Sequence, residues 1–207
     1  MNYRNVAKMT AIAGLYSTFT FAADVTKSAD AIQLAVDGGI TTFVSPTNVS
    51  AISVKGKSNA LHAEATVRHT ADGLQIEHIA ATLPVKSLVT GMGLRDEHMR
   101  KYVFTTSDGQ TPDLRFEGQN VACKEAVCKI AGTLTIRGVG HAFTLPVKIK
   151  EDGSQFKASG EGTVKLSDYG IEQPSQLGVK STNEVQLHLE FVAKPASARM
   201  ASNGGVR

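Results

Sequence analysis

The sequence predicts an all-β protein: an antiparallel β-barrel of eight to ten strands with one short helix. Three observations support this fold class. Apolar and polar residues alternate along most of the chain, turn signals separate the alternating runs, and a single segment has helical spacing. The 207 residues are 42% hydrophobic and 20% charged, which is typical of a folded globular chain with one large or two small domains.

The first residues have the layout of a secretory signal peptide. Arg4 and Lys8 precede an uncharged run, 9–23, which is too short and too rich in Thr and Ser for a membrane span. We expect cleavage after Ala22, which makes 1–22 the leader. Its removal lowers the formal charge from +3 to +1, because it carries two basic residues and no acid. The mature protein is therefore expected in the periplasm or outside the cell.

The rest of the chain is expected to form one domain, 23–194, followed by a flexible polar tail, 195–207. Strict alternation predicts antiparallel strands with one apolar face, as in 60–69, where Leu61 and Val67 belong to the apolar set. The other alternating runs are 114–119, 130–137, 143–149, 156–166 and 185–191.

Glycine-containing turn signals divide these runs, and one run changes phase. The turn signals stand at 37–39, 71–73, 137–140 and 151–153. Within 75–83 the alternation shifts around 77–79, which indicates a β-bulge.

One segment, 94–103, has the spacing of a short helix. Asp96 and Glu97 each stand four residues before a base and are expected on its outer side. The opposite face is expected to turn inward and cap the barrel; it holds Leu94, Arg95, His98 and Tyr102.

The inward faces of the strands contain many small residues among Leu, Ile, Val and Phe. These are Ala63, Ala65, Ala80, Gly118, Gly132, Ala158, Gly160 and Gly162. Two explanations are open. Small side chains leave room inside an eight-stranded barrel for a ligand, or they relieve crowding where strands bend. Because few charged residues lie on the inward faces, a cavity here should be apolar.

Cys123 and Cys128 lie between two alternating runs. A hairpin with a four-residue loop, 124–127, would place them opposite each other at a separation that suits a disulfide. Oxidation is the usual state in an exported protein. We expect a structural disulfide that pins the hairpin, contributing about 2 kcal/mol for so short a loop, and neither redox chemistry nor a zinc site.

The sequence gives little support for catalysis, metal binding or nucleic-acid binding. The six histidines lack metal-ligand spacing, no nucleophile elbow or phosphate loop is present, and basic residues are never more than two in a row. His98 and Asp96 are two positions apart on a helix, so they point away from each other and make a poor acid/base pair. Arg95 could neutralise an anionic head group or pair with Asp96 or another carboxylate; the ion pair is favoured.

Four segments, in this order, resemble the YceI-like proteins. The first is Thr90-Gly91 with 95–100 and Phe104, similar to "TG…RDxHLR…F". The second, 111–116, is similar to "P-x-ϕ-x-F". The third, 132–139 with 145–147, is similar to "GxLTIRGV…LPV", and the fourth, 167–171, to "SDFGI". Order and spacing agree over roughly 31–193, nearly the whole mature chain.

The resemblance implies an extended lipocalin-like barrel with a capping helix, periplasmic or secreted. It would hold a long apolar lipid, such as a polyisoprenoid or an isoprenoid quinone, for carriage or sequestration. Other expectations are no further cofactor, transient contact with a membrane surface, no nucleic-acid partner, and a monomer or homodimer. Ordinary core packing explains each candidate ligand contact equally well; these are Leu88, Leu94, Arg95, His98, Met99, Tyr102, Phe104, Phe116, Leu134, Ile136 and Phe143.

Two alternatives remain at this point. One is a barrel with a filled core that acts as a protein-interaction or stress-response module. The other is a lipid-modifying enzyme with His98 as its acid/base. A continuous internal cavity would distinguish the leading hypothesis from the first alternative.

Overall fold

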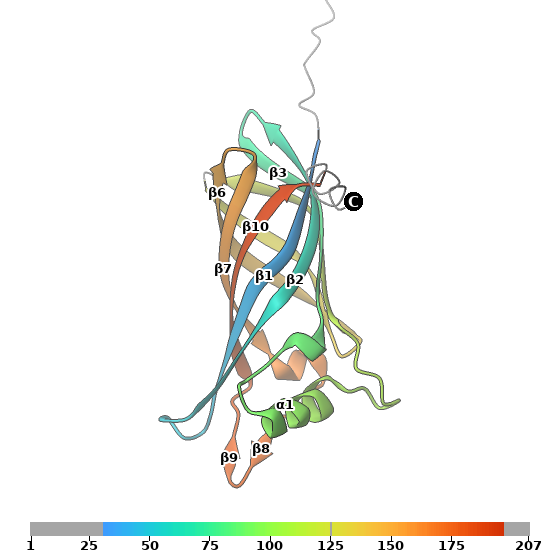
Figure 1. The fold of residues 1–207 in the computed structure, drawn as a ribbon, viewed down its shortest axis with the longest axis vertical. Coiled ribbons are helices and arrows are strands. Elements are labelled where there is room, and N and C mark those ends of the chain that lie inside the picture. Colours follow the sequence, from blue (N-terminus) through green and yellow to red (C-terminus); the bar gives the residue numbers. More distant parts are fainter. Residues whose placement is uncertain (1–30, 125, 197–207) are drawn as a thin grey trace, which may run out of the picture.

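Eight antiparallel strands close into a barrel in the computed structural model, which describes residues 31–124 and 126–196 (Figure 1). Each barrel strand pairs with its neighbours along the chain except at one point, where β7 pairs with β10, and β10 then closes the barrel against β1. The barrel strands are β1 (Ile32–Pro46), β2 (Ser53–Thr70), β3 (Gly73–Leu83), β4 (Leu114–Lys124), β5 (Val127–Ile136), β6 (Val139–Asp152), β7 (Gln155–Lys165) and β10 (Glu184–Pro195). The predicted all-β barrel with one helix is confirmed.

The remaining elements lie in the connections at one end of the barrel. The β3–β4 connection contains a 3₁₀ turn (Val85–Ser87), the helix α1 (Gly93–Met99) and a π-helical turn (Arg100–Phe104) that continues it. The β7–β10 connection contains a second 3₁₀ turn (Leu166–Tyr169) and the small hairpin β8 (Ser175–Gln176) and β9 (Val179–Lys180). We call this end the helix end; it is the lower end in Figure 1.

Both chain boundaries that the sequence suggested fall partly outside the described residues. The expected leader, 1–22, and most of the expected tail lie there. Pro195, however, is the last residue of β10, and Ala196 is hydrogen-bonded to β1. Pro195 pairs with Leu34, and the Ala196 N–H donates to the Gln33 carbonyl at 2.8 Å.

The predicted bulge is confirmed, and one predicted turn is wrong. His78 and Ile76 pair with the adjacent residues Thr66 and Val67 of β2, which leaves Glu77 as the extra residue of a bulge. The glycines at 37–39 do not end a strand. They form a second bulge within β1, where the pairing register shifts around Gly39 against both β2 and β10. A Cβ on Gly39 would lie only 2.8 Å from Cβ of Phe191 on β10. Glycine therefore lets β1 run close against its partner.

The interior is divided into two apolar clusters along the barrel axis. One cluster fills the end formed by the β2–β3, β4–β5 and β6–β7 turns, which we call the filled end; Val67, Ile76 and Val147 are among its members. The other surrounds the helix end and includes Leu88, Phe104 and Tyr169. Phe116 and Phe191 pack against both clusters and mark the level at which they meet.

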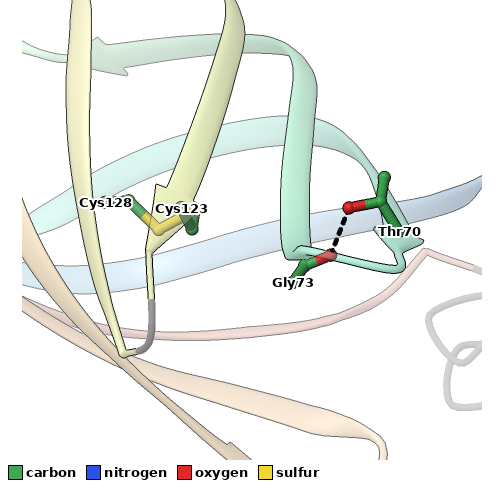
Figure 2. Close-up of a disulfide and its surroundings, with 4 residues drawn as sticks. All are labelled: Thr70, Gly73, Cys123 and Cys128. Carbon is green, nitrogen blue, oxygen red and sulfur yellow. Dashed lines mark hydrogen bonds between the residues drawn. A yellow bond between two sulfur atoms is a disulfide. The ribbon is translucent and has the colours of Figure 1, made fainter.

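A disulfide joins β4 and β5 at the filled end. Cys123 and Cys128 are direct cross-strand partners with their Cα atoms 4.2 Å apart. Lys124 pairs with Val127, so the loop has two residues rather than the four predicted. Figure 2 shows the bridge beside the β2–β3 turn, where the Thr70 hydroxyl donates to the Gly73 carbonyl at 2.9 Å.

Candidate ligand-binding cavity

The barrel is hollow toward the helix end. A cavity of about 1100 Å³ is lined by side chains from all eight barrel strands, α1 and the β8–β9 hairpin. Ordinary small-molecule pockets measure about 300–1,000 Å³, so this cavity is large. The filled-core alternative therefore describes only the filled end of the barrel.

Small residues keep this cavity open in two different ways. A Cβ on Gly132 would lie 2.7 Å from the Phe116 ring, and one on Gly162 would lie 3.1 Å from the Phe143 ring. The two rings thus occupy the space that side chains at these glycines would need, and they pack edge to face with each other at 6.4 Å between centroids. Ala63 and Ala81, in contrast, line the cavity directly. Both explanations of the small residues therefore hold here: the glycines relieve crowding by the two rings, and the alanines leave space inside the barrel.

Most of the candidate contact residues do lie on the cavity wall; whether they touch a ligand stays a prediction. The residues on the wall are Leu88, Arg95, His98, Met99, Tyr102, Phe104, Phe116, Leu134, Ile136 and Phe143. Leu94 is the exception, because its side chain is 63% exposed and lies outside the cavity. Tyr102 borders the opening of the cavity at the helix end, which we call the mouth, but it is itself 59% exposed. It therefore closes the mouth only partly.

The helix is rotated relative to the predicted face because Asp96 anchors it. Asp96 was expected to point outward, yet it is only 6% exposed. Its carboxylate accepts hydrogen bonds from the Thr90 N–H at 2.7 Å and from the Thr90 hydroxyl at 2.5 Å. The Arg95 guanidinium donates to the Thr90 hydroxyl at 2.8 Å and to its carbonyl at 2.9 Å. Polar contacts, which hydrophobic periodicity does not register, thus set the orientation of α1.

The surroundings of Asp96 keep its carboxylate charged. Burial acts to raise its pKa, but the hydrogen bonds from Thr90 and the positive charges of Arg100 and Arg95 outweigh burial and lower the pKa below the ordinary value of 3.8. His98 packs edge-on against the Tyr102 ring at 5.6 Å. These contacts favour structural roles for Asp96 and His98 over an acid/base pair.

Sequence reasoning missed two parts of the wall. On β1, Thr41, Phe43 and Ser45 line the cavity, but the run was obscured by the supposed turn at 37–39. The β8–β9 hairpin was missed because its turn is Leu177-Gly178, whereas the usual signal is Asn-Gly or Asp-Gly.

A second, smaller cavity of about 50 Å³ lies among apolar side chains of the filled end. It shares four wall residues with the main cavity: Ala63, Ile79, Ile130 and Phe191. These side chains form a partition, which we call the cavity floor. The floor sets the depth that a ligand can reach from the mouth.

Within residues 31–124 and 126–196, no helix combines the length and hydropathy needed to cross a membrane. Within the same residues, no group of three His, Cys, Asp or Glu side chains is placed to hold a metal ion.

The sequence model of one protein family, described as the YceI-like domain, matches residues 25–193. The chain belongs to the YceI-like family. The match contains α1 and nearly the whole barrel, and it confirms the resemblance that four short segments suggested. In this YceI-like chain, the first of those segments supplies Thr90, Arg95 and Asp96, the residues that anchor the helix.

Curated relatives of this YceI-like protein come from Pseudomonas. A UPF0312 protein of Pseudomonas paraeruginosa is 32% identical over 119 residues, and one of Pseudomonas aeruginosa is 31% identical over 119 residues. Each alignment covers 55% of this chain and 60% of the relative. The chain thus spans about 60% of the length of the curated relatives it matches.

Three solved structures share the YceI-like fold. A polyisoprenoid binding domain from Saccharophagus degradans has a TM-score of 0.61 at 14% identity and covers 79% of this chain and 99% of its own. BcnA of Burkholderia cenocepacia has a TM-score of 0.59 at 20% identity, covering 74% and 95%. The YceI protein of Campylobacter jejuni has a TM-score of 0.57 at 22% identity, covering 68% and 84%. At these identities the likeness shows the fold.

Proposed function

We propose that this protein binds one long apolar lipid, a polyisoprenoid, an isoprenoid quinone or a similar molecule, inside the barrel, for carriage or sequestration in the periplasm or outside the cell. The observation that carries the proposal is the cavity of about 1100 Å³, apolar along most of its wall and bordered by the mouth at the helix end. A long chain would enter past α1 and end at the cavity floor.

Apolar burial would supply the affinity. Each five-carbon isoprene unit taken out of water contributes about 4 kcal/mol before the cost of ordering, at the usual value per methylene. A few buried units therefore suffice for tight binding. Specificity would come from cavity length and from the polar groups at the mouth, Arg95 and His98 among them.

The comparisons support the proposal without naming this protein's ligand. The structural neighbour from Saccharophagus degradans is itself described as a polyisoprenoid binding domain. Binding rather than catalysis is proposed because His98 and Asp96 are engaged with Tyr102 and Thr90. The export route is proposed from the signal-peptide pattern of 1–22.

A melting-temperature titration tests the proposal. A ligand that binds only the folded state raises stability by RT ln(1 + [L]/Kd), about 2.7 kcal/mol at a hundred times Kd. We expect delipidated protein to gain several degrees on addition of an isoprenoid quinone or a polyprenyl phosphate. A short-chain analogue with the same head group is the control and should give a smaller gain. No gain with any long-chain lipid would contradict the proposal.

A further inference from the structure

Leu177 is a large apolar residue in full contact with water. It occupies the turn between β8 and β9, where Gln176 pairs with Val179, and its side chain is 97% exposed. The hairpin stands at the helix end, the end at which α1 also lies (Figure 1). A leucine in this position contributes nothing to the apolar core.

The backbone at this turn also disfavours leucine. The φ angles are 51° at Leu177 and 79° at Gly178, so both residues of the turn have positive φ. Such two-residue turns favour Asn, Asp or Gly at the first position, and bulky side chains with positive φ are uncommon. The stability of the folded chain therefore does not account for Leu177.

Other exposed apolar side chains surround the same opening. Ile52, Tyr102 and Leu177 are exposed and also border the cavity, so apolar surface continues from the outside into the interior. We call the exposed apolar set around the mouth the rim. It comes from the β1–β2 loop, the α1 region and the β8–β9 hairpin, and consists of Val49, Ile52, Met92, Leu94, Tyr102 and Leu177.

The arrangement of the rim fits a lipid bilayer better than a folded protein. Three separate elements project at the helix end (Figure 1) and contribute residues to the border of the cavity, and a deformable surface can contact all three at once. The Lys101 ammonium lies 5.3 Å from the centre of the Tyr102 ring. Tyrosine and lysine are both residue types that occupy membrane interfaces, because each has an apolar body and a polar end. Acidic and basic residues are both exposed at this end, Glu97 and Glu172 together with Lys101 and Lys180. Apolar contact rather than net charge would therefore supply most of the attraction.

We propose that the rim docks on a lipid bilayer with Leu177 inserted at its leading point, so that the cavity mouth faces the membrane from which the lipid is taken or to which it is given. This deepens the proposed function and rests on it, because a carrier must exchange its lipid with a membrane. The surface is assigned by the position of the rim around the mouth and by the strained, exposed Leu177.

Because the chain contains no Trp, the fluorescence of one introduced tryptophan reports on that position alone. Leu177→Trp is compared with Ser154→Trp, an exposed residue in the β6–β7 turn at the filled end. Vesicles of phosphatidylethanolamine and phosphatidylglycerol are added to each folded protein. We expect the tryptophan emission of Leu177→Trp to shift to shorter wavelength and that of Ser154→Trp to stay unchanged. A shift in both variants, or in neither, would overturn the docking proposal.

Leu177→Asn separates membrane contact from folding. Asparagine suits the positive φ of the turn, so the melting temperature should be equal or higher, while partition into the same vesicles should fall about tenfold through loss of one buried leucine. Undiminished vesicle partition would contradict the proposal. Native mass spectrometry of each preparation records its bound lipid. Protein that carries a lipid but shows no Leu177→Trp shift contradicts docking alone, whereas protein that stays empty contradicts the proposed function.

Discussion

At the scale of single residues, Thr41 places a hydroxyl group in a buried position. Its side chain is 5% exposed, and within the described residues its hydroxyl has no hydrogen-bond partner. A buried polar group left unpaired costs about 1–3 kcal/mol. The hydroxyl of Thr47, just after the end of β1, shares its single proton between the carbonyls of Val49 and Ile52, at 3.0 and 2.9 Å.

This difference predicts opposite effects for two matched substitutions. Thr41→Val should raise the free energy of unfolding of lipid-free protein by about 1 kcal/mol, because it removes an unpaired hydroxyl. Thr47→Val should lower it by about 1 kcal/mol, because it removes paired groups. Urea unfolding measures both. Equal losses in the two variants would show that the Thr41 hydroxyl is satisfied in solution.

Phe191 is the largest side chain of the cavity floor. Phe191→Ala should join the two cavities, and because the smaller one holds roughly four water-sized groups, the gain in depth should admit about one more isoprene unit. Offered a mixture of polyprenyl chain lengths, this variant should retain longer chains than the wild type, as measured by mass spectrometry of extracted lipid.

The control is Leu187→Ala, which enlarges the main cavity on the same strand away from the floor. It should leave the preferred chain length unchanged. Phe191→Leu is the milder variant if the alanine substitution destabilises the barrel. An identical chain-length distribution in wild type and both Phe191 variants would mean that the floor does not limit the ligand.

At the scale of elements, the Asp96 anchor predicts how α1 responds to acid. The folded-state pKa of Asp96 is lowered, so its contribution to stability is present above the ordinary aspartate value and is lost as pH falls through the folded pKa. Asp96→Asn should be less stable than the wild type by about 1–3 kcal/mol at neutral pH. The difference in the free energy of unfolding between the wild type and Asp96→Asn should decrease below about pH 4.

Urea unfolding of the two proteins at neutral and acidic pH measures this gap. Glu97→Gln, an exposed change on the same helix, serves as the control and should change stability little at either pH. A stability difference between wild type and Asp96→Asn that does not depend on pH would contradict the anchor.

Elements were predictable from the sequence where one signal dominates. Alternation identifies the strands that carry Leu61, Leu134 and Leu187, because the pleat sends every second side chain inward. The segment Asp37-Gly38-Gly39 was predicted as a turn but forms a bulge. Glycine is common in both structures, and only the pairing with β2 and β10 distinguishes them. The rotation of α1 depends on Thr90, a residue before the helix, so helical spacing alone could not reveal it.

At the scale of the whole molecule, the barrel combines a filled end with a hollow one. The disulfide and the cluster that includes Val147 stabilise the filled end, and the cavity, the helix and the rim occupy the other. The sequence-based candidates on the wall, such as Phe116 and Phe143, were found because inward position follows from alternation. The mouth was harder to predict, because it is built from connections rather than from periodic elements.

Native mass spectrometry of the protein isolated from its own cells tests the proposed lipid binding most directly. We expect an intact mass that exceeds the chain mass by one polyprenyl-type lipid per chain, with the excess lost on denaturation. A bare chain mass, both as isolated and after incubation with vesicles that contain isoprenoid quinones and polyprenyl phosphates, would contradict it.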